Sequence, residues 1–331
     1  MLVLGIETSC DETAVAVIEN GRIIRSNIVA SQINLHQKYG GVVPEIAFRC
    51  HAELIYPVID EALEKASIPL EDIQAIAVTQ GPGLIGSLVV GVTAAKSLAY
   101  ALRLPLVGVN HLEAHLWANF LEHPDLKFPF IGLLISGGHT CLFYLTAPGQ
   151  YELLGTTRDD AIGECFDKVA KLLGLGYPGG PIIDDLARKG DCHAIRFPQA
   201  MMKDKSLDFS FSGLKTAVVY YVKSLKSPPI VEDVAASFQE AAIEVLVKRV
   251  FSAVRLKQVN KILLAGGVAA NSRLREVFTA RFGGQGGQIY YPSPGLCTDN
   301  AAMVGALGYD KLMRGETADW KLNAIPDFKL G

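Results

Sequence analysis

Two histidines one helical turn apart, His111 and His115, are the residues of this sequence best suited to do chemistry. In an α-helix, positions i and i+4 lie about 40° apart around the axis, so both imidazoles can reach one metal ion. Two surface or structural histidines could share this spacing, and the pair alone leaves both interpretations open. A zinc protease needs a Glu directly after the first His. Here Glu113 comes one position later and points to another side of the helix, which argues against a protease.

A third candidate ligand is Asp299, which begins the last predicted helix as His111 begins the corresponding helix of the first half. If the halves are related by a pseudo-dyad, we expect Asp299 and the two histidines to meet across the cleft between the halves. Two imidazoles and one carboxylate with open positions suit catalytic iron(II) or zinc. The competing interpretation is that Asp299 is only a helix N-cap, for which Thr298-Asp299-Asn300 is well suited.

Three glycine-rich turns in the second half indicate a nucleotide site: 136–140, 176–181 and 266–271. The first joins two predicted strands and could present backbone N–H groups to phosphates. The second is followed by Asp184 and Asp185, which could bind ribose hydroxyls. Each turn alone is ordinary, but three in this order suggest an adenine nucleotide. The chain has no P-loop motif, and the Gly-x-Gly-x-x-Gly at 81–86 lacks the acidic residue of a dinucleotide site.

Asp11 lies in the first predicted hairpin, where it could face the nucleotide's leaving group or simply form an acidic turn. Basic residues gather in the second half, and they form either a solvated face or a patch for a phosphate backbone. These basic residues are Lys168, Lys171, Arg188, Lys189, Lys203, Lys205, Lys215, Lys223 and Lys226.

The order of predicted elements repeats: three strands, helix, strand, helix, strand, helix. We therefore predict an α/β protein with two RNase H-like halves, the actin/sugar kinase/Hsp70 (ASKHA) architecture, and a ligand cleft between them. The predicted boundary places residues 1–124 in the first half. Residues 125–331 form the second, with an inserted helical segment around 176–228. The last helix is expected over 299–313.

Composition fits a globular protein of two domains: 331 residues, half of them apolar and a fifth charged. The formal net charge of −3 does not by itself indicate nucleic-acid binding. The six cysteines form no Cys-x-x-Cys pair, which favours reduced thiols. The N-terminus lacks the basic region of a signal peptide, and the two long uncharged stretches, 73–95 and 128–151, contain turn residues. We expect a cytoplasmic protein without a membrane span.

The motifs together resemble the Kae/TsaD family of tRNA N6-adenosine threonylcarbamoyltransferases, once described as O-sialoglycoprotein endopeptidases. The resemblance covers nearly the whole chain. The motifs that carry it are Gly5–Thr13, Gly41–Glu45, Asn110–His115, Ser136–Thr140, Phe166–Lys171, Phe209–Lys215, Gly266–Asn271 and Thr298–Met303.

This resemblance implies that His111, His115 and Asp299 hold one divalent metal, Fe²⁺ by family expectation with Zn²⁺ permitted. It implies that the substrate threonylcarbamoyl-AMP contacts Leu134, Ile135, Ser136, Gly137, Gly138, Asp167, Gly180, Asp184 and Asn271. The acceptor would be the adenosine at position 37 of tRNAs reading ANN codons, and the partners TsaB and TsaE. Asp11 is our candidate catalytic residue, to position the N6 amine or accept its proton.

Three alternatives stay open at this point: an ASKHA-type ATPase or kinase, a metalloprotease, and a non-catalytic scaffold. Kinases of this architecture hold Mg²⁺ largely through carboxylates, phosphates and water. The paired imidazoles therefore favour the transferase.

Overall fold

The computed structural model describes residues 1–199 and 206–330, and these fold into two compact units, each built on one five-stranded sheet. The first unit comprises Met1–Leu126 and Thr298–Leu330, and the second comprises Lys127–Cys297. Both sheets have the same topology, β3-β2-β1-β4-β5 in the first and β8-β7-β6-β9-β10 in the second. In each, the first strand pairs antiparallel with the second and parallel with the fourth. The predicted α/β duplication is confirmed.

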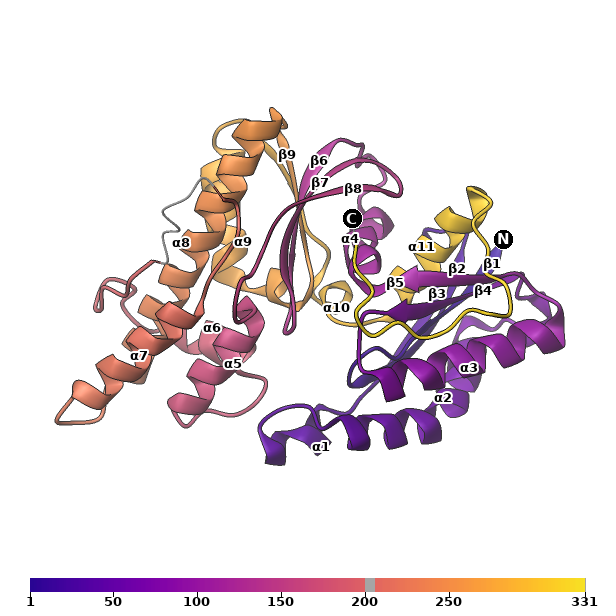
Figure 1. Ribbon diagram of the computed structural model, residues 1–331, viewed down its shortest axis with the longest axis horizontal. Coiled ribbons are helices and arrows are strands. Elements are labelled where there is room, and N and C mark those ends of the chain that lie inside the picture. The colour runs from indigo at the N-terminus through magenta and orange to yellow at the C-terminus, as the bar shows by residue number, and fades with distance from the viewer. Residues whose placement is uncertain (200–205, 331) are drawn as a thin grey trace. The chain divides into compact units, whose positions relative to one another are not determined.

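The strands of the first unit are β1 (Leu2–Glu7), β2 (Glu12–Glu19), β3 (Ile23–Ser31), β4 (Ala75–Gly81) and β5 (Leu106–Asn110). Its helices are α1 (Ile33–His36), α2 (Pro44–Ala66), α3 (Ile85–Leu102), α4 (His111–Glu122) and α11 (Ala301–Met313). Helices α2 and α3 pack on one face of the sheet, and α11, with α4 against it, packs on the other (Figure 1). The apolar strands β1 and β4 are buried between these layers because both of their faces are covered.

Close approach of α11 to the sheet depends on glycine. A Cβ on Gly5 of β1 would lie 2.7 Å from the backbone N of Gly305, and a Cβ on Gly305 would meet the Ile18 side chain at 2.7 Å. No side chain fits between these two backbones. Strand β1 therefore holds α11, and Asp299 just before it, in the first unit.

Two sequence-based expectations change here. The predicted second half, 125–331, included the last helix, whereas Thr298–Leu330 packs with the first unit because α11 covers β1. That helix begins at Ala301 rather than at 299, since the Asn300 side chain accepts from Met303 N at 3.1 Å and is its N-cap.

The strands of the second unit are β6 (Phe130–Ile135), β7 (Thr140–Ala147), β8 (Gln150–Thr156), β9 (Lys261–Ala265) and β10 (Gln288–Tyr290). Its helices are α5 (Ile162–Leu172), α6 (Gly179–Ala187), α7 (Ser212–Ser224), α8 (Val231–Lys257), α9 (Ser272–Phe278) and α10 (Pro294–Cys297). A π-helical turn, Thr279–Gly283, continues α9. Helices α6 and α7 lie within 176–228, the range of the predicted inserted helical segment.

One described helix, α3, is long and apolar enough to cross a membrane by length and composition. It packs against α2 and β4, and seven of its residues are buried. Val92, Ala95 and Ala99 belong to the hydrophobic core of the first unit.

Candidate functional site

The first unit brings His111, His115 and Asp299 together. Their potential ligand atoms all lie within 4.8 Å of one another. One oxygen of Asp299, Oδ1, lies 3.1 Å from His115 Nε2 and 3.5 Å from His111 Nε2. Both imidazoles are buried, whereas 20% of the Asp299 side chain is exposed. The cluster therefore has one open side.

The N-cap interpretation of Asp299 is wrong, because Asn300 caps α11. Asn110 is likewise the N-cap of α4, because its side chain accepts from Leu112 N and Glu113 N at 2.9 and 3.2 Å. In both places an asparagine satisfies the first helical N–H groups. The neighbouring residue, His111 or Asp299, is thereby available for another role.

Glu7 orients His111. Its Oε2 lies 3.0 Å from His111 Nδ1 and accepts from Thr79 Oγ1 at 2.6 Å, and its Oε1 accepts from Ser9 N at 2.5 Å. Burial alone raises the pKa of this carboxyl, but the charge and hydrogen bond of His111 lower it below the usual value. An ionised Glu7 holds the proton of His111 on Nδ1 and leaves Nε2 free to coordinate.

The pKa of His111 is raised to about 9, since Glu7 and Asp299 outweigh the lowering effect of burial. His115 is supported differently. Its Nδ1 is buried and has no hydrogen-bond partner among the described residues. The two Nε2 atoms and Asp299 Oδ1 converge, so the donor set fits a divalent metal that prefers nitrogen and oxygen ligands.

Two further acidic residues, Asp11 and Glu12, follow β1, and the charge of Asp299 acts on Glu12. Asp11 is buried, with 7% of its surface exposed. The pKa of its neighbour Glu12 is raised to about 10 by burial and by the charges of Asp299 and Asp11. Three acids thus lie near enough to repel one another, which favours a cation at this place. The sequence had pointed to the turn that contains Asp11 but had assigned no role to Glu7.

The predicted adenylate residues belong to the second unit, around the carboxyl ends of the parallel strands β6 and β9. Leu134 and Ile135 are buried at the end of β6. The turn after them is closed by Ser136 N donating to His139 O at 2.9 Å. The N–H groups of Gly137 and Gly138 make no hydrogen bond within the described residues, and a Cβ there would meet nothing within 4 Å. These exposed amides can bind an anion.

Other predicted residues of this site already make internal contacts. Asp167 accepts from Gly179 N at 2.7 Å, next to Gly180. Asp184 accepts from Ser272 N and Ser272 Oγ at 3.0 and 2.9 Å. These hydrogen bonds hold the start of α6 to α5 and the start of α9 to α6.

Asn271 caps α9 by accepting from Leu274 N at 2.9 Å, and it donates to Gln239 at 2.7 Å. Of the nine residues predicted for the adenylate, Gly137 and Gly138 are the most open to a ligand, through their backbone.

The repeated sheets together with a His₂-Asp cluster define an ASKHA-type protein with a candidate metal centre. A family model described as "TsaD: tRNA N6-adenosine threonylcarbamoyltransferase" matches residues 23–306. A protein of Clostridium kluyveri named tRNA N6-adenosine threonylcarbamoyltransferase is 55% identical over 333 aligned positions, covering 99% of this chain and 98% of the relative. The chain belongs to the TsaD family, whose members are acyltransferases that modify tRNA.

Two solved structures share the fold at low identity. Full-length HypF, in a phosphate- and nucleotide-bound form, is 14% identical with a TM-score of 0.65, over 97% of this chain and 56% of HypF. The (R)-2-hydroxyglutaryl-CoA dehydratase component A of Acidaminococcus fermentans is 16% identical with a TM-score of 0.56. That match covers 95% of this chain and 99% of the component. Both likenesses support the ASKHA assignment.

Proposed function

We propose that this chain transfers the threonylcarbamoyl group from threonylcarbamoyl-AMP to N6 of the adenosine at position 37 of tRNAs that read ANN codons, and releases AMP. Family membership supports the transfer to tRNA. The observation that supports catalysis at a metal centre is the cluster of His111, His115 and Asp299, with Glu7 fixing the tautomer of one imidazole. An ATPase or kinase of this fold has no need of paired imidazoles and is not favoured.

The proposed reaction forms a bond between N6 and the carbamoyl carbon and breaks the bond from that carbon to the phosphate oxygen of AMP. The free N–H groups of Gly137 and Gly138 stabilise the departing phosphate. Asp11 positions the N6 amine and accepts the proton that it loses. A metal bound by the His₂-Asp cluster would supply Lewis-acid polarisation of the carbonyl. We propose Fe²⁺ as this metal, with Zn²⁺ as the alternative to be distinguished by elemental analysis of the purified protein.

The role of Asp11 has a matched control in the same unit. Asp11→Asn removes a carboxylate that can accept a proton, whereas Glu19→Gln replaces a carboxylate that pairs with Arg25. We expect Asp11→Asn to slow transfer by on the order of 10²-fold and Glu19→Gln to have little effect. Equal rates for wild type and Asp11→Asn, at normal adenylate binding, would remove Asp11 from the mechanism.

We further propose that the cytoplasmic partners are TsaB and TsaE, and that TsaB docks on α2 and α3. Four large apolar side chains are exposed there: Phe48 (43%), Tyr56 (54%), Ile85 (53%) and Val89 (40%). A Cβ on Gly86 would lie 3.2 Å from the Phe48 Cβ, so α2 and α3 are in close contact at these two residues. An exposed apolar face of this kind is typical of a protein interface.

The proposed activity is tested with purified protein, both partners, synthetic threonylcarbamoyl-AMP and an unmodified ANN-reading tRNA. Mass spectrometry of the digested tRNA should detect threonylcarbamoyladenosine in amounts equal to the AMP released. ATP hydrolysis by the chain without tRNA modification would instead support the ATPase interpretation.

A further inference from the structure

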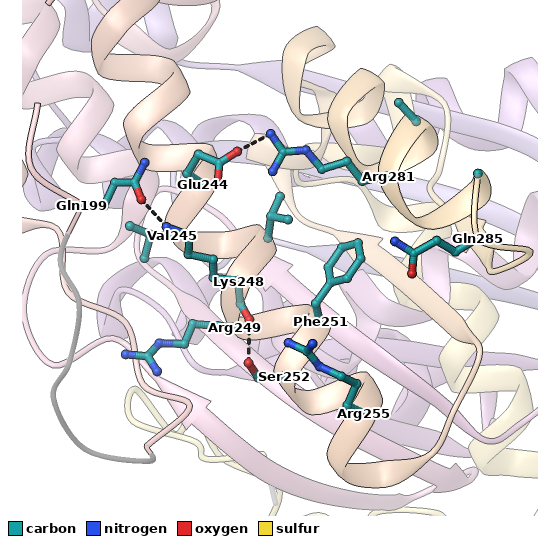
Figure 2. Close-up of a pocket in the computed structure, with 13 residues that line it drawn as sticks. Gln199, Glu244, Val245, Lys248, Arg249, Phe251, Ser252, Arg255, Arg281 and Gln285 are labelled. Atoms are coloured by element: carbon teal, nitrogen blue, oxygen red, sulfur yellow. Dashed lines mark hydrogen bonds and ion pairs between the residues drawn. The ribbon is translucent and has the colours of Figure 1, made fainter. Parts of the chain in front are cut away.

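A basic groove runs along α8 in the second unit. Its first part is a hollow of about 710 Å³ between α8 and the turn after α9, and its second part is a hollow of about 380 Å³ beside residues 192–199. The two hollows share Gln199, Glu244 and Arg281, so they are continuous. Figure 2 shows the first part.

The groove carries five cationic side chains and two acidic ones. The cations are Arg196, Lys248, Arg249, Arg255 and Arg281, and the acids are Glu240 and Glu244. Both acids are already paired, Glu244 with Arg281 and Glu240 with Arg273 at 2.8 Å. A surplus of positive charge therefore faces solvent here, although the whole chain has a net charge of −3.

The cations differ in how strongly they are held. Arg249 donates to Ser206 O at 2.5 Å, and Lys248 donates to Gln199, as Figure 2 shows for the latter pair. Arg196 and Arg255 are exposed and have no partner within the described part of the chain. These two guanidinium groups are available to a ligand.

Helical spacing arranges several of these groups along one line. Lys248, Ser252 and Arg255 follow at i, i+4 and i+7, on one face of α8 and about 10 Å from end to end. A row of exposed cations without a buried polar anchor suits a phosphate backbone better than a small enclosed ligand.

We propose that the basic groove binds the phosphate backbone of the acceptor tRNA. This inference rests on the proposed function for the identity of the RNA. None of the described residues that line the groove belongs to the basic cluster suggested by the sequence, of which Lys203 and Lys205 lie outside the described residues. Helix α8 links it to the candidate adenylate residues, because Gln239 on α8 accepts from Asn271.

The test compares four pairs of substitutions in the complete complex with partners. Arg196→Gln/Arg255→Gln alters the groove, and Arg22→Gln/Lys65→Gln removes two exposed cations of the first unit as a matched control. Lys223→Gln/Lys226→Gln removes two cations of the basic cluster that the sequence suggested in the second unit. Arg196→Lys/Arg255→Lys retains the charge and should restore most of the binding.

Two lost phosphate contacts should raise the Kd for unmodified tRNA on the order of 50-fold at 50 mM salt and about fourfold to sevenfold at 200 mM. The KM for tRNA should rise in parallel while kcat at saturating tRNA is retained. If Arg196→Gln/Arg255→Gln has the same Kd as the control pair at both salt concentrations, the proposal is refuted. It is also refuted if only Lys223→Gln/Lys226→Gln weakens tRNA binding.

The two hypotheses fail separately. If wild type modifies tRNA and the groove variant binds tRNA normally, the groove assignment falls and the transferase stands. If wild type forms no threonylcarbamoyladenosine, and Arg196→Gln/Arg255→Gln binds tRNA more weakly than wild type, the groove assignment is supported and the proposed reaction is refuted.

Discussion

Replacing Glu7 with glutamine tests whether the structure prepares His111 to bind a metal. The carboxylate lies 3.0 Å from His111 Nδ1, and its oxygens also accept from Thr79 and Ser9. Glu7→Gln keeps the volume but turns one acceptor into a donor, which must then face one of these donors. Loss of such a supporting contact typically weakens metal affinity 10–100-fold, or about 1.4–2.7 kcal/mol.

The assay is a metal titration of metal-free protein in competition with a chelator of known affinity, for Fe²⁺ under anaerobic conditions and for Zn²⁺. Glu19→Gln is the matched control, since Glu19 lies in the same unit and pairs with Arg25 rather than with the cluster. In the same variant, the pKa of His111 should fall below about 9, because a main cause of its increase is removed. Metal affinity equal to that of the control, with an unchanged imidazole titration, would refute the orienting role.

Three further predictions follow from the contacts. Metal-free protein should lose stability as the pH rises from about 6.5, the usual pKa of histidine, to about 9, the pKa of His111 in the folded protein. Protonated His111 stabilises the fold, and this contribution is complete only below the pKa of the unfolded chain. Denaturant unfolding at a series of pH values measures the loss. Asp159→Asn should lower the free energy of unfolding by about 2 kcal/mol, since Asp159 accepts from Phe211 N and Ser212 Oγ among others at the start of α7; unchanged stability would contradict that anchoring role. Gly5→Ala should lower the free energy of unfolding by about 1–3 kcal/mol and also weaken metal binding, because the added Cβ displaces α11. A metal titration equal to that of wild type would show that α11 does not position Asp299.

The proposed docking face yields a separate prediction. Phe48→Asp/Ile85→Asp should abolish co-purification with TsaB while the Tm of the isolated chain stays within about 3 °C, because both side chains are already exposed. Tyr220→Asp, at a residue that is 70% exposed in the second unit, is the control. Undiminished co-purification of the double variant would place the partner elsewhere.

Local sequence predicted the parts of the site that depend on spacing. His111 and His115 are four residues apart on one helix, so the period of the helix alone brings them together. The duplicated order of elements predicted both sheets. Asp299 lies near the histidines for another reason, because α11 packs against β1 and α4 within the first unit. The family resemblance reached the same three residues independently.

Contacts distant in sequence could not be predicted in this way. Glu7 supports His111 from 104 residues away, and only the pairing of β1 with β4 and β5 with β4 brings Glu7, Thr79 and His111 together. The basic groove combines Arg196, Arg255 and Arg281 from three separate segments. The Asn300 cap was visible in the sequence, but the choice between Asn300 and Asp299 depended on the backbone around α11.

The most direct measurement of the central claim determines product and metal together in the reconstituted reaction. Wild type is compared with His111→Ala/His115→Ala, with the near-isosteric Asp299→Asn, and with His123→Ala as a control histidine at the end of α4. We predict one equivalent of bound divalent metal and threonylcarbamoyladenosine for wild type and His123→Ala, and loss of both for the cluster variants. Full product formation by a folded, metal-free Asp299→Asn protein would contradict the account.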